Sequence, residues 1–155
     1  MGSKQELKRQ GLMLVTAESC TGGWAAQLMT SVSGSSEWFE RGFVAYTNLA
    51  KSEMLGVKTT ILSRYGAVSD QAARAMAEGA LAHSHAQVAL AITGIAGPSG
   101  GTPEKPVGTV HFAWAAKKRD TQSRKQIFAG DRESVRRQAV TAALQGVLEY
   151  LKSSD

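Results

Sequence analysis

Two side chains able to act as nucleophiles stand next to each other near the start of the chain, Ser19 and Cys20. They lie in the segment 17–23, between an apolar run at 12–15 and a helical pattern at 24–29. A serine hydroxyl is a weak nucleophile without an adjacent base, whereas a thiol at a helix N-terminus is activated because its pKa is lowered there. The residue types leave both nucleophiles open, and a small buried thiol is the alternative reading of Cys20.

The same segment is a strand-to-helix turn, in which Thr21, Gly22 and Gly23 open the helix. Ligands of α/β proteins bind outside the carboxyl ends of the strands, and free N–H groups at a helix start donate hydrogen bonds to an oxyanion or a phosphate. We therefore expect Cys20 and the three residues after it to contact a ligand, and their N–H groups to stabilise an oxyanion.

A lysine is the candidate base, because no histidine forms an evident Ser-His-Asp arrangement with Ser19. The pKa of a lysine falls when it is buried, so that the neutral amine becomes available. Lys51 follows the second predicted strand, and the phenol of Tyr46 could relay or hold a proton beside it. Spacing alone also allows a solvated helix face for Lys51.

The three histidines do not suggest a metal site. His83 and His85 flank Ser84 at a predicted helix end without a third ligand nearby, and His111 falls within a predicted strand. No Cys/His cluster has zinc spacing, and the Gly-rich fingerprints of dinucleotide and P-loop sites are absent. We expect neither a metal nor a cofactor.

Three segments rich in small and hydroxylated residues follow predicted strands, at 18–23, 45–48 and 93–98. If their strands are parallel neighbours, all three segments meet at one edge of the sheet and form one cleft. Thr93, Gly94 and Gly97 would then line its wall. Taken singly, each segment is explained equally well as turn chemistry.

The formal net charge of +5 makes nucleic acid one candidate partner. The basic residues at 117–119 and 124–125 are interpreted as a solvated hairpin tip. Arg132 and Arg136 lie four apart on one face of the last predicted helix, where they could bind an anion or form surface salt bridges. Aromatic residues make up only 6% of the chain and no basic stripe contains them, so nucleic acid is the weakest hypothesis.

The pattern of the chain predicts alternating helices and strands. Asn48, Ser69-Asp70 and Gly130-Asp131 are candidate helix caps. These elements predict one domain over residues 1–155, a three-layer α/β/α fold with a mixed, mostly parallel sheet. The expected strands are 12–18, 38–47, 88–95, 107–116 and 122–128, and the expected helices are 4–10, 24–30, 49–55, 71–84 and 132–151, with a further turn from 59 to 65.

Composition is that of a globular protein, with 43% hydrophobic and 20% charged residues. No apolar run approaches the ~20 residues needed to span a bilayer. The first residues lack the apolar region of a signal peptide, and a single cysteine excludes an internal disulfide framework. We therefore expect a cytoplasmic protein without membrane association.

Short motifs recur along almost the whole chain in one order. They are Ala17–Gly23, Gly42–Asn48 with Lys51, Leu55–Val57, Gly66–Ser69, Thr93–Pro98, Lys105–Val110, and Gly130–Arg132 with Arg136. Together they resemble the C-terminal domain of the CinA family, the nicotinamide-nucleotide amidohydrolases. The combination of Glu18–Gly23 with Thr93–Pro98 is specific to that family.

The resemblance implies hydrolysis of the carboxamide of nicotinamide mononucleotide (NMN) to nicotinate mononucleotide and ammonia, in pyridine nucleotide salvage. It implies Ser19 as nucleophile, in preference to Cys20, with Lys51 as base and Tyr46 nearby. The substrate phosphate needs cationic partners, for which Arg132 and Arg136 are the candidates. Longer CinA proteins carry an additional N-terminal domain, and we expect this chain to be the stand-alone form.

A non-catalytic, nucleotide-binding regulatory module of the competence-associated type is the alternative function. The presence of Ser19, Tyr46 and Lys51 favours an enzyme, since a pure binding module needs no nucleophile beside a base. We also expect a homo-oligomer, with a dimer favoured. Apolar residues such as Trp38, Phe39 and Trp114 would serve either an interface or the core.

Overall fold

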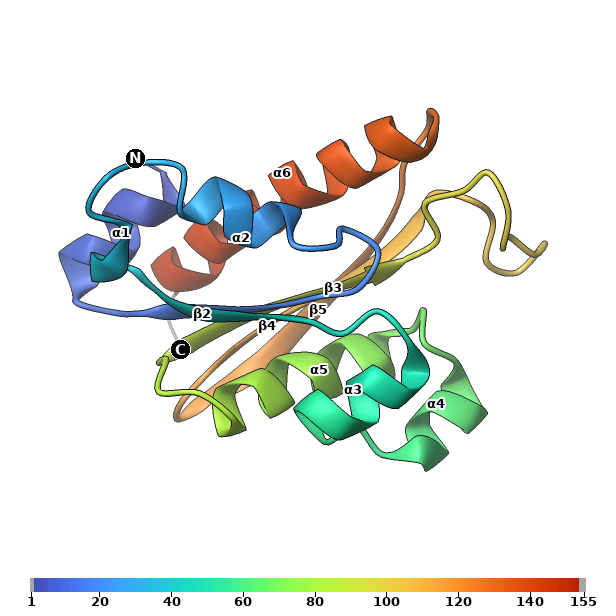
Figure 1. The fold of residues 1–155 in the computed structure, drawn as a ribbon, viewed down its shortest axis with the longest axis horizontal. Helices are drawn as coiled ribbons and strands as arrows, with labels where there is room; N and C mark the ends of the chain where they lie inside the picture. The colour runs from blue at the N-terminus through green and yellow to red at the C-terminus, as the bar shows by residue number, and fades with distance from the viewer. Residues whose placement is uncertain (1, 154–155) are drawn as a thin grey trace.

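The computed structural model describes residues 2–153, which form a five-stranded sheet between two layers of helices (Figure 1). Helices α1, α2 and α6 cover one face, and α3, α4 and α5 cover the other. The predicted three-layer α/β/α fold is confirmed. The helices are α1 (Ser3–Gln10), α2 (Trp24–Met29), α3 (Asn48–Leu55), α4 (Thr59–Tyr65), α5 (Asp70–Ala82) and α6 (Arg132–Lys152), with a 3-10 turn at Ser35–Glu37.

The sheet is mixed, with strand order β2-β1-β3-β4-β5. Strand β1 pairs in parallel with both β2 and β3, whereas β4 runs antiparallel to β3 and to β5. Only β4 therefore opposes the other strands, as expected for a mostly parallel sheet. The strands are β1 (Leu14–Glu18), β2 (Phe39–Val44), β3 (Val88–Gly94), β4 (Thr109–Ala116) and β5 (Arg119–Ile127).

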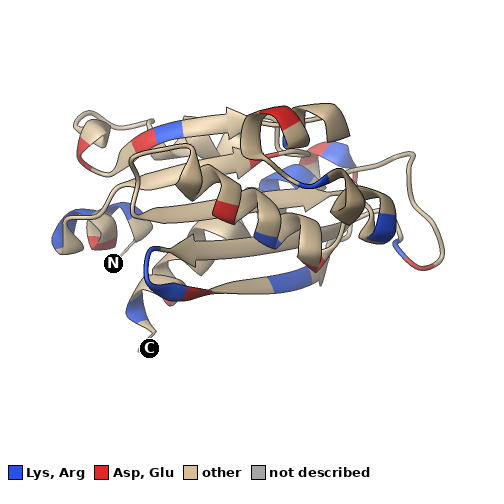
Figure 2. Cartoon of the chain, turned by 90° about the horizontal axis from the view of Figure 1, so that it is seen from below, with Lys and Arg blue, Asp and Glu red and all other residues tan. Residues whose placement is uncertain are grey.

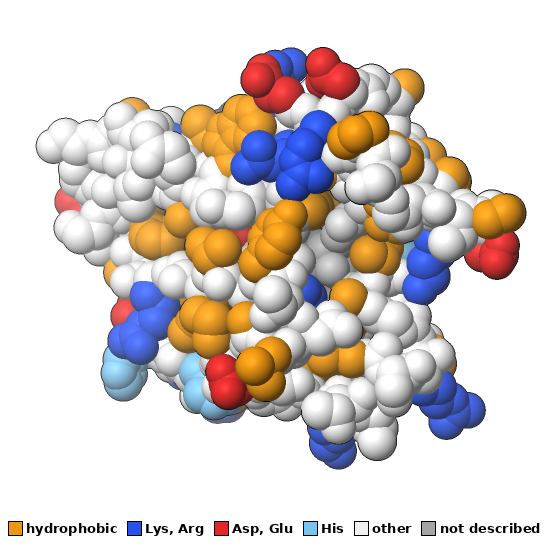
Figure 3. Space-filling view, turned by 45° about the vertical axis from the view of Figure 1, so that its right-hand side comes forward, with side chains coloured by type: hydrophobic (Ala, Val, Ile, Leu, Met, Phe, Trp, Pro, Cys, Tyr) orange, Lys and Arg blue, Asp and Glu red, His pale blue; other side chains and the backbone are white. Residues whose placement is uncertain are grey.

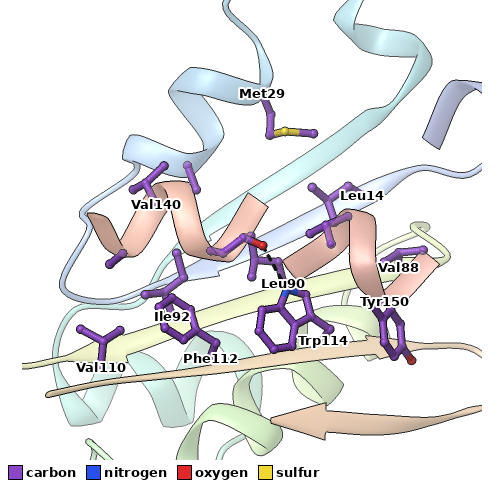
Figure 4. Close-up of a cluster of buried hydrophobic side chains, with 14 of the residues drawn as sticks. Leu14, Met29, Val88, Leu90, Ile92, Val110, Phe112, Trp114, Val140 and Tyr150 are labelled. Carbon is purple, nitrogen blue, oxygen red and sulfur yellow. Dashed lines mark hydrogen bonds between the residues drawn. The ribbon is translucent and has the colours of Figure 1, made fainter. Parts of the chain in front are cut away.

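The two faces of the sheet carry side chains of different size. On the face toward α6, large residues such as Leu90, Phe112 and Trp114 form one buried cluster (Figure 4). On the face toward α5, strand residues Ala89 and Ala91 pack against an alanine-rich helix. Strand β3 is buried on both faces, which explains its near-continuous apolar sequence.

Two of the three candidate interface residues belong to the core instead. Trp38 and Trp114 are buried, and each indole N–H donates to a main-chain carbonyl, of Met29 at 2.9 Å and of Ala143 at 3.1 Å. Phe39 is partly buried and packs against the same cluster. These aromatic residues therefore hold α2 and α6 onto the sheet.

Several element ends differ from the sequence expectations. Strand β1 begins at Leu14, and β5 begins at Arg119 because the β4–β5 connection is a tight turn in which Lys118 has a φ of 64°. The basic residues 117–119 thus stand at this hairpin, as predicted. Arg124 and Lys125 do not, because they lie within β5, where Arg124 donates to Glu149 at 2.8 Å. The N-cap of α3 is Thr47, whose hydroxyl accepts from the N–H of Ala50, and not Asn48.

Charged residues of both signs are distributed over the molecule. In the view of Figure 2, segments with Lys or Arg and segments with Asp or Glu are scattered over the elements, and no continuous basic stripe is seen. Among the described residues, no helix is both long and apolar enough to cross a membrane.

Candidate active site

A cavity of about 330 Å³ opens where β1, β2 and β3 end. Figure 3 brings this edge of the sheet forward and shows the surface hollowed near the centre, below a group of basic side chains. The three segments predicted to meet at one edge do meet here, because their strands are parallel neighbours. Of the predicted site residues, those lining the cavity are Ser19, Cys20, Tyr46, Lys51, Thr93, Gly94, Gly97 and Arg132.

The hydroxyl of Ser19 and the amine of Lys51 are in contact, with Oγ and Nζ 3.0 Å apart. Ser19 lies just after β1, and the first turn of α3 directs Lys51 toward it. The main-chain oxygen of Tyr46 lies 3.0 Å from Nζ and 3.4 Å from Oγ. Two residues that are 32 positions apart are thus joined across the ends of β1 and β2.

Lys51 is buried, with 1% of its surface exposed, so the alternative of a solvated helix face is wrong. Burial disfavours the charged ammonium and lowers the pKa of Lys51. No carboxylate forms an ion pair with it within residues 2–153. The site therefore favours a neutral amine, which can accept the proton of the neighbouring hydroxyl.

Cys20 is buried beside this pair, and burial raises the pKa of its thiol to about 11. The expectation that a helix N-terminus would lower this pKa is therefore wrong. Desolvation outweighs the nearby Arg136 and the thiol's own main-chain N–H, which both act in the opposite direction. Cys20 is a neutral thiol at neutral pH, whereas nucleophilic cysteines react as thiolates.

The side chain of Glu18 occupies the N-terminus of α2. Its buried carboxylate accepts from the N–H groups of Ala25 and Ala26, at 2.8 and 3.0 Å, and from the Thr21 hydroxyl at 2.6 Å. The first N–H groups of the helix are thus occupied, contrary to the sequence expectation. Sequence reasoning missed this role because the carboxylate precedes the helix by six residues, outside the usual capping spacing.

Arg132, the first residue of α6, joins two rims of the cavity. Its guanidinium donates to the main-chain oxygen of Gly97 at 2.9 Å and to the phenol oxygen of Tyr46 at 3.0 Å. Tyr46 is 54% exposed, its phenol is directed to Arg132, and only its main chain reaches Lys51. On the facing wall, the Thr93 hydroxyl donates to the carbonyl of Ala67 at 2.8 Å.

The structure does not bring four of the predicted site residues into the cavity. Thr21 is fully buried and bound to Glu18, while Gly22 and Gly23 form the outer part of the turn with φ of 60° and 104°. Arg136 lies behind the turn, where it donates to main-chain carbonyls.

The described residues contain no group of three or more His, Cys, Asp and Glu side chains able to hold a metal. His111 is buried in β4, and its Nδ1 lies 2.9 Å from the carboxylate of Asp70. His83 is bonded to the carbonyl of Gly79 at the end of α5. Both histidines are thus engaged in contacts away from Ser19 and Lys51.

Known proteins are similar to this chain in sequence and in fold. The sequence profile of the CinA C-terminal domain matches residues 2–151. The chain belongs to the CinA C-terminal domain family. Another member, nicotinamide-nucleotide amidohydrolase PncC of Escherichia coli K12, is 53% identical over 141 residues, which cover 91% of this chain and 86% of the relative. PncC of Pseudomonas putida is 50% identical, covering 94% and 90%.

Solved CinA structures confirm the fold. The competence/damage inducible protein CihA from Agrobacterium tumefaciens superposes with a TM-score of 0.89 at 46% identity, covering 99% of this chain and 98% of that protein. A CinA superfamily protein from Escherichia coli gives a TM-score of 0.90 at 42% identity, covering 94% and 84%. The resemblance predicted from the motifs is therefore confirmed over nearly the whole chain.

Proposed function

We propose that this chain hydrolyses the carboxamide of NMN to nicotinate mononucleotide and ammonia, as an amidohydrolase of pyridine nucleotide salvage. The observation that carries this proposal is the 3.0 Å contact between the Ser19 hydroxyl and the buried amine of Lys51 in the cavity. The names of the PncC relatives, nicotinamide-nucleotide amidohydrolases, supply the substrate class. A neutral lysine beside a serine is an established way to activate that nucleophile without histidine.

The reaction then runs through an ester on Ser19. Neutral Lys51 accepts the hydroxyl proton while Oγ attacks the amide carbon, which gives a tetrahedral oxyanion. The resulting ammonium of Lys51 donates its proton to the amide nitrogen, and ammonia leaves as the nicotinoyl ester forms. The same base next accepts a proton from water, which attacks the ester and releases the carboxylate and the serine hydroxyl. The electron-withdrawing pyridinium ring of the substrate makes its amide carbon easier to attack.

Two features of the cavity suit a nucleotide. Its volume, about 330 Å³, lies within the range of roughly 300–1,000 Å³ found for small-molecule sites. Arg132 holds a guanidinium at the rim, where it would bind the substrate phosphate, while Thr93, Gly94 and Gly97 form the wall beside the nucleotide. Arg136 already donates to two carbonyls outside the cavity, so we assign the phosphate to Arg132 rather than to both arginines.

Ammonia release from NMN tests this function, with nicotinamide riboside and nicotinamide as comparison substrates. We expect turnover of NMN, its loss in Ser19→Ala, and its retention in Cys20→Ala as the matched control. Activity that survives in Ser19→Ala and disappears in Cys20→Ala would overturn the nucleophile assignment. If NMN raises the melting temperature of the wild type and no ammonia forms, the chain is the regulatory binding module instead.

We further propose that the enzyme works in the cytoplasm as a homo-oligomer, most simply a dimer. Exposed apolar side chains lie at the end of β2, an edge strand of the sheet, and just after it; they include Val44, Tyr46 and Leu49. Apolar patches beside an open strand edge are common sites of association. Light scattering after size exclusion measures the mass directly, and a value of 16.4 kDa, that of one chain, would contradict an oligomer.

A further inference from the structure

Thr93, near the end of β3, lies next to the nucleophile. Strands β1 and β3 pair in parallel as far as Glu18 and Ile92, and the N–H of Ser19 donates to the carbonyl oxygen of Ile92 at 2.9 Å. Ser19 and Thr93 are the residues that follow this pair on the two neighbouring strands. Because adjacent strands lie about 4.8 Å apart, the two side chains start from neighbouring positions at the carboxyl edge of the sheet.

Both side chains point to the same face of the sheet. Ala17 in β1 and Ala91 in β3 belong to the buried cluster on the face toward α5. Side chains alternate between faces along a strand, so Ser19 and Thr93, two residues further on, return to that face. Both line the cavity, and Thr93 is 1% exposed, like Lys51. Thr93 is therefore buried against the site in which Ser19 and Lys51 meet.

The single proton of the Thr93 hydroxyl is already in use. Oγ1 donates to the main-chain oxygen of Ala67 at 2.8 Å, and a carbonyl oxygen can only accept. Ala67 belongs to the segment 66–69 between α4 and α5, which has no regular secondary structure and contributes to the cavity wall. Turning the proton toward a ligand would leave that carbonyl without its donor, which costs free energy. The bond thus fixes the direction in which this hydroxyl donates.

Toward a ligand, this hydroxyl can act only as a hydrogen-bond acceptor. A hydroxyl has one proton and two lone pairs, and no N–H or O–H group within residues 2–153 donates to Oγ1 of Thr93. A carboxamide has two N–H donors on its nitrogen, whereas an ionised carboxylate has none. An acceptor beside the nucleophile therefore binds the amide nitrogen and repels the oxygens of the acid.

We propose that Thr93 is a specificity-determining residue, whose hydroxyl accepts a hydrogen bond from the carboxamide nitrogen of the substrate and disfavours the carboxylate of the product. This inference rests on the proposed function and deepens it, because it assigns the group that distinguishes an amide from an acid. A site that hydrogen-bonds one group of its substrate discriminates against an analogue lacking that group, since its own buried polar group is then left unpaired. The same contact holds the nitrogen of the scissile amide near Lys51, which donates the proton to it.

Binding measurements without turnover test this role. In the Ser19→Ala background, which cannot form the ester, calorimetry gives the Kd of NMN and of nicotinate mononucleotide, and the ratio of the two reports the preference for the amide. We expect the acid to bind at least about tenfold more weakly than the amide when Thr93 is present. Thr93→Val nearly keeps the shape and removes the hydroxyl, so we expect it to reduce that preference by about tenfold.

Two further variants separate selectivity from stability. Thr93→Ser keeps the hydroxyl and should retain the preference within about twofold. Thr109→Val is the matched control, because Thr109 is also 1% exposed and its hydroxyl also donates to a main-chain oxygen, that of Pro106 at 2.7 Å, but it does not line the active-site cavity. Both valine variants should lower the melting temperature by similar amounts, and only Thr93→Val should change the ratio.

Three results would contradict the inference. The first is equal weakening of both ligands in Thr93→Val, which indicates a purely structural role. The second is a changed ratio in Thr109→Val, and the third is a lost preference in folded Thr93→Ser. Melting temperatures identify any variant that fails to fold, and Thr93→Ala, which also lacks the hydroxyl, then replaces Thr93→Val.

A second pair of ligands, nicotinamide and nicotinate, distinguishes failure of this inference from failure of the proposed function. These two molecules carry the same amide and acid groups without the ribose phosphate. A preference for nicotinamide that disappears in Thr93→Val supports the role of Thr93 even if the wild type releases no ammonia from NMN. Turnover of NMN by the wild type, together with an unchanged binding ratio in Thr93→Val, retains the proposed function and rejects the role of Thr93.

Discussion

The carboxyl edge of the sheet buries polar side chains, whereas the layer beneath α6 buries apolar ones. At the edge, the polar side chains of Glu18, Ser19 and Lys51 are buried, and each contacts another polar group. Beneath α6, the buried side chains are large and apolar, as Phe112 and Trp114 illustrate. Burying an amine costs free energy, whereas burying apolar area supplies it. The difference indicates that the α6 layer stabilises the fold while the edge carries groups arranged for chemistry.

The largest expected effect comes from Lys51→Met, which should affect the edge alone. Without the base we expect amidase activity to fall by at least about 10²–10⁴-fold. Because methionine has no charged form to desolvate, the free energy of unfolding should stay equal or rise. Ammonia release and urea unfolding at pH 7 measure the two quantities. A variant that loses stability as well as activity would show that the edge also supports the fold.

The complementary change is Gly146→Val in α6. A Cβ at this position would lie 2.0 Å from Cζ2 of Trp114, so the helix must move away from β4. Overpacking of this kind costs about 1–3 kcal/mol or more, and we expect urea unfolding to show it while the folded fraction keeps its kcat. Gln145→Ala, at the neighbouring exposed position, is the control and should be nearly neutral. Loss of kcat in the fully folded variant would mean that the layer also positions the site.

The pH dependence of activity and of stability should both reflect the titration of Lys51 at the carboxyl edge. Burial lowers the pKa of Lys51 from its usual 10.5, so kcat/KM should rise with pH and level off below that value as the amine becomes neutral. Between the lowered pKa and 10.5, the unfolded chain binds more protons at Lys51 than the folded chain. The free energy of unfolding should therefore also rise with pH in this window. Lys51→Met should lose that part of the rise, and an identical pH profile in both proteins would contradict a neutral Lys51.

The smallest effect is expected for Cys20→Ala. Its thiol is neutral and lines the cavity, so we expect kcat to change only a few-fold and the free energy of unfolding to fall by about 1 kcal/mol. Ammonia release after treatment with a thiol reagent gives a second measurement. Inhibition of the wild type and not of Cys20→Ala would reflect blockage of the cavity, whereas an inactive Cys20→Ala would assign the chemistry to the thiol.

The sequence predicted the residues at the carboxyl edge of the sheet better than the main-chain contacts that hold them in place. The apolar run of β3 and the small or hydroxylated residues after three strands predicted both the sheet and the cleft, because strand burial and ligand-binding turns leave local patterns. The contact of Arg136 with the carbonyl of Cys20 joins residues 116 positions apart. Main-chain carbonyls are present in every residue, so such a contact leaves no pattern in residue types or spacing. For the same reason, the approach of the Tyr46 main chain to Lys51 could not be foreseen from its phenol.

The reversal of direction at β4 has an evolutionary consequence. A chain leaving β3 for another parallel strand would have to cross to the far end of the sheet, whereas here residues 95–108 depart and return at the same rim. Insertions or deletions in this connection would alter the entrance for substrates and leave strand pairing intact. Related proteins could thus acquire a different substrate range by changing the length of one segment.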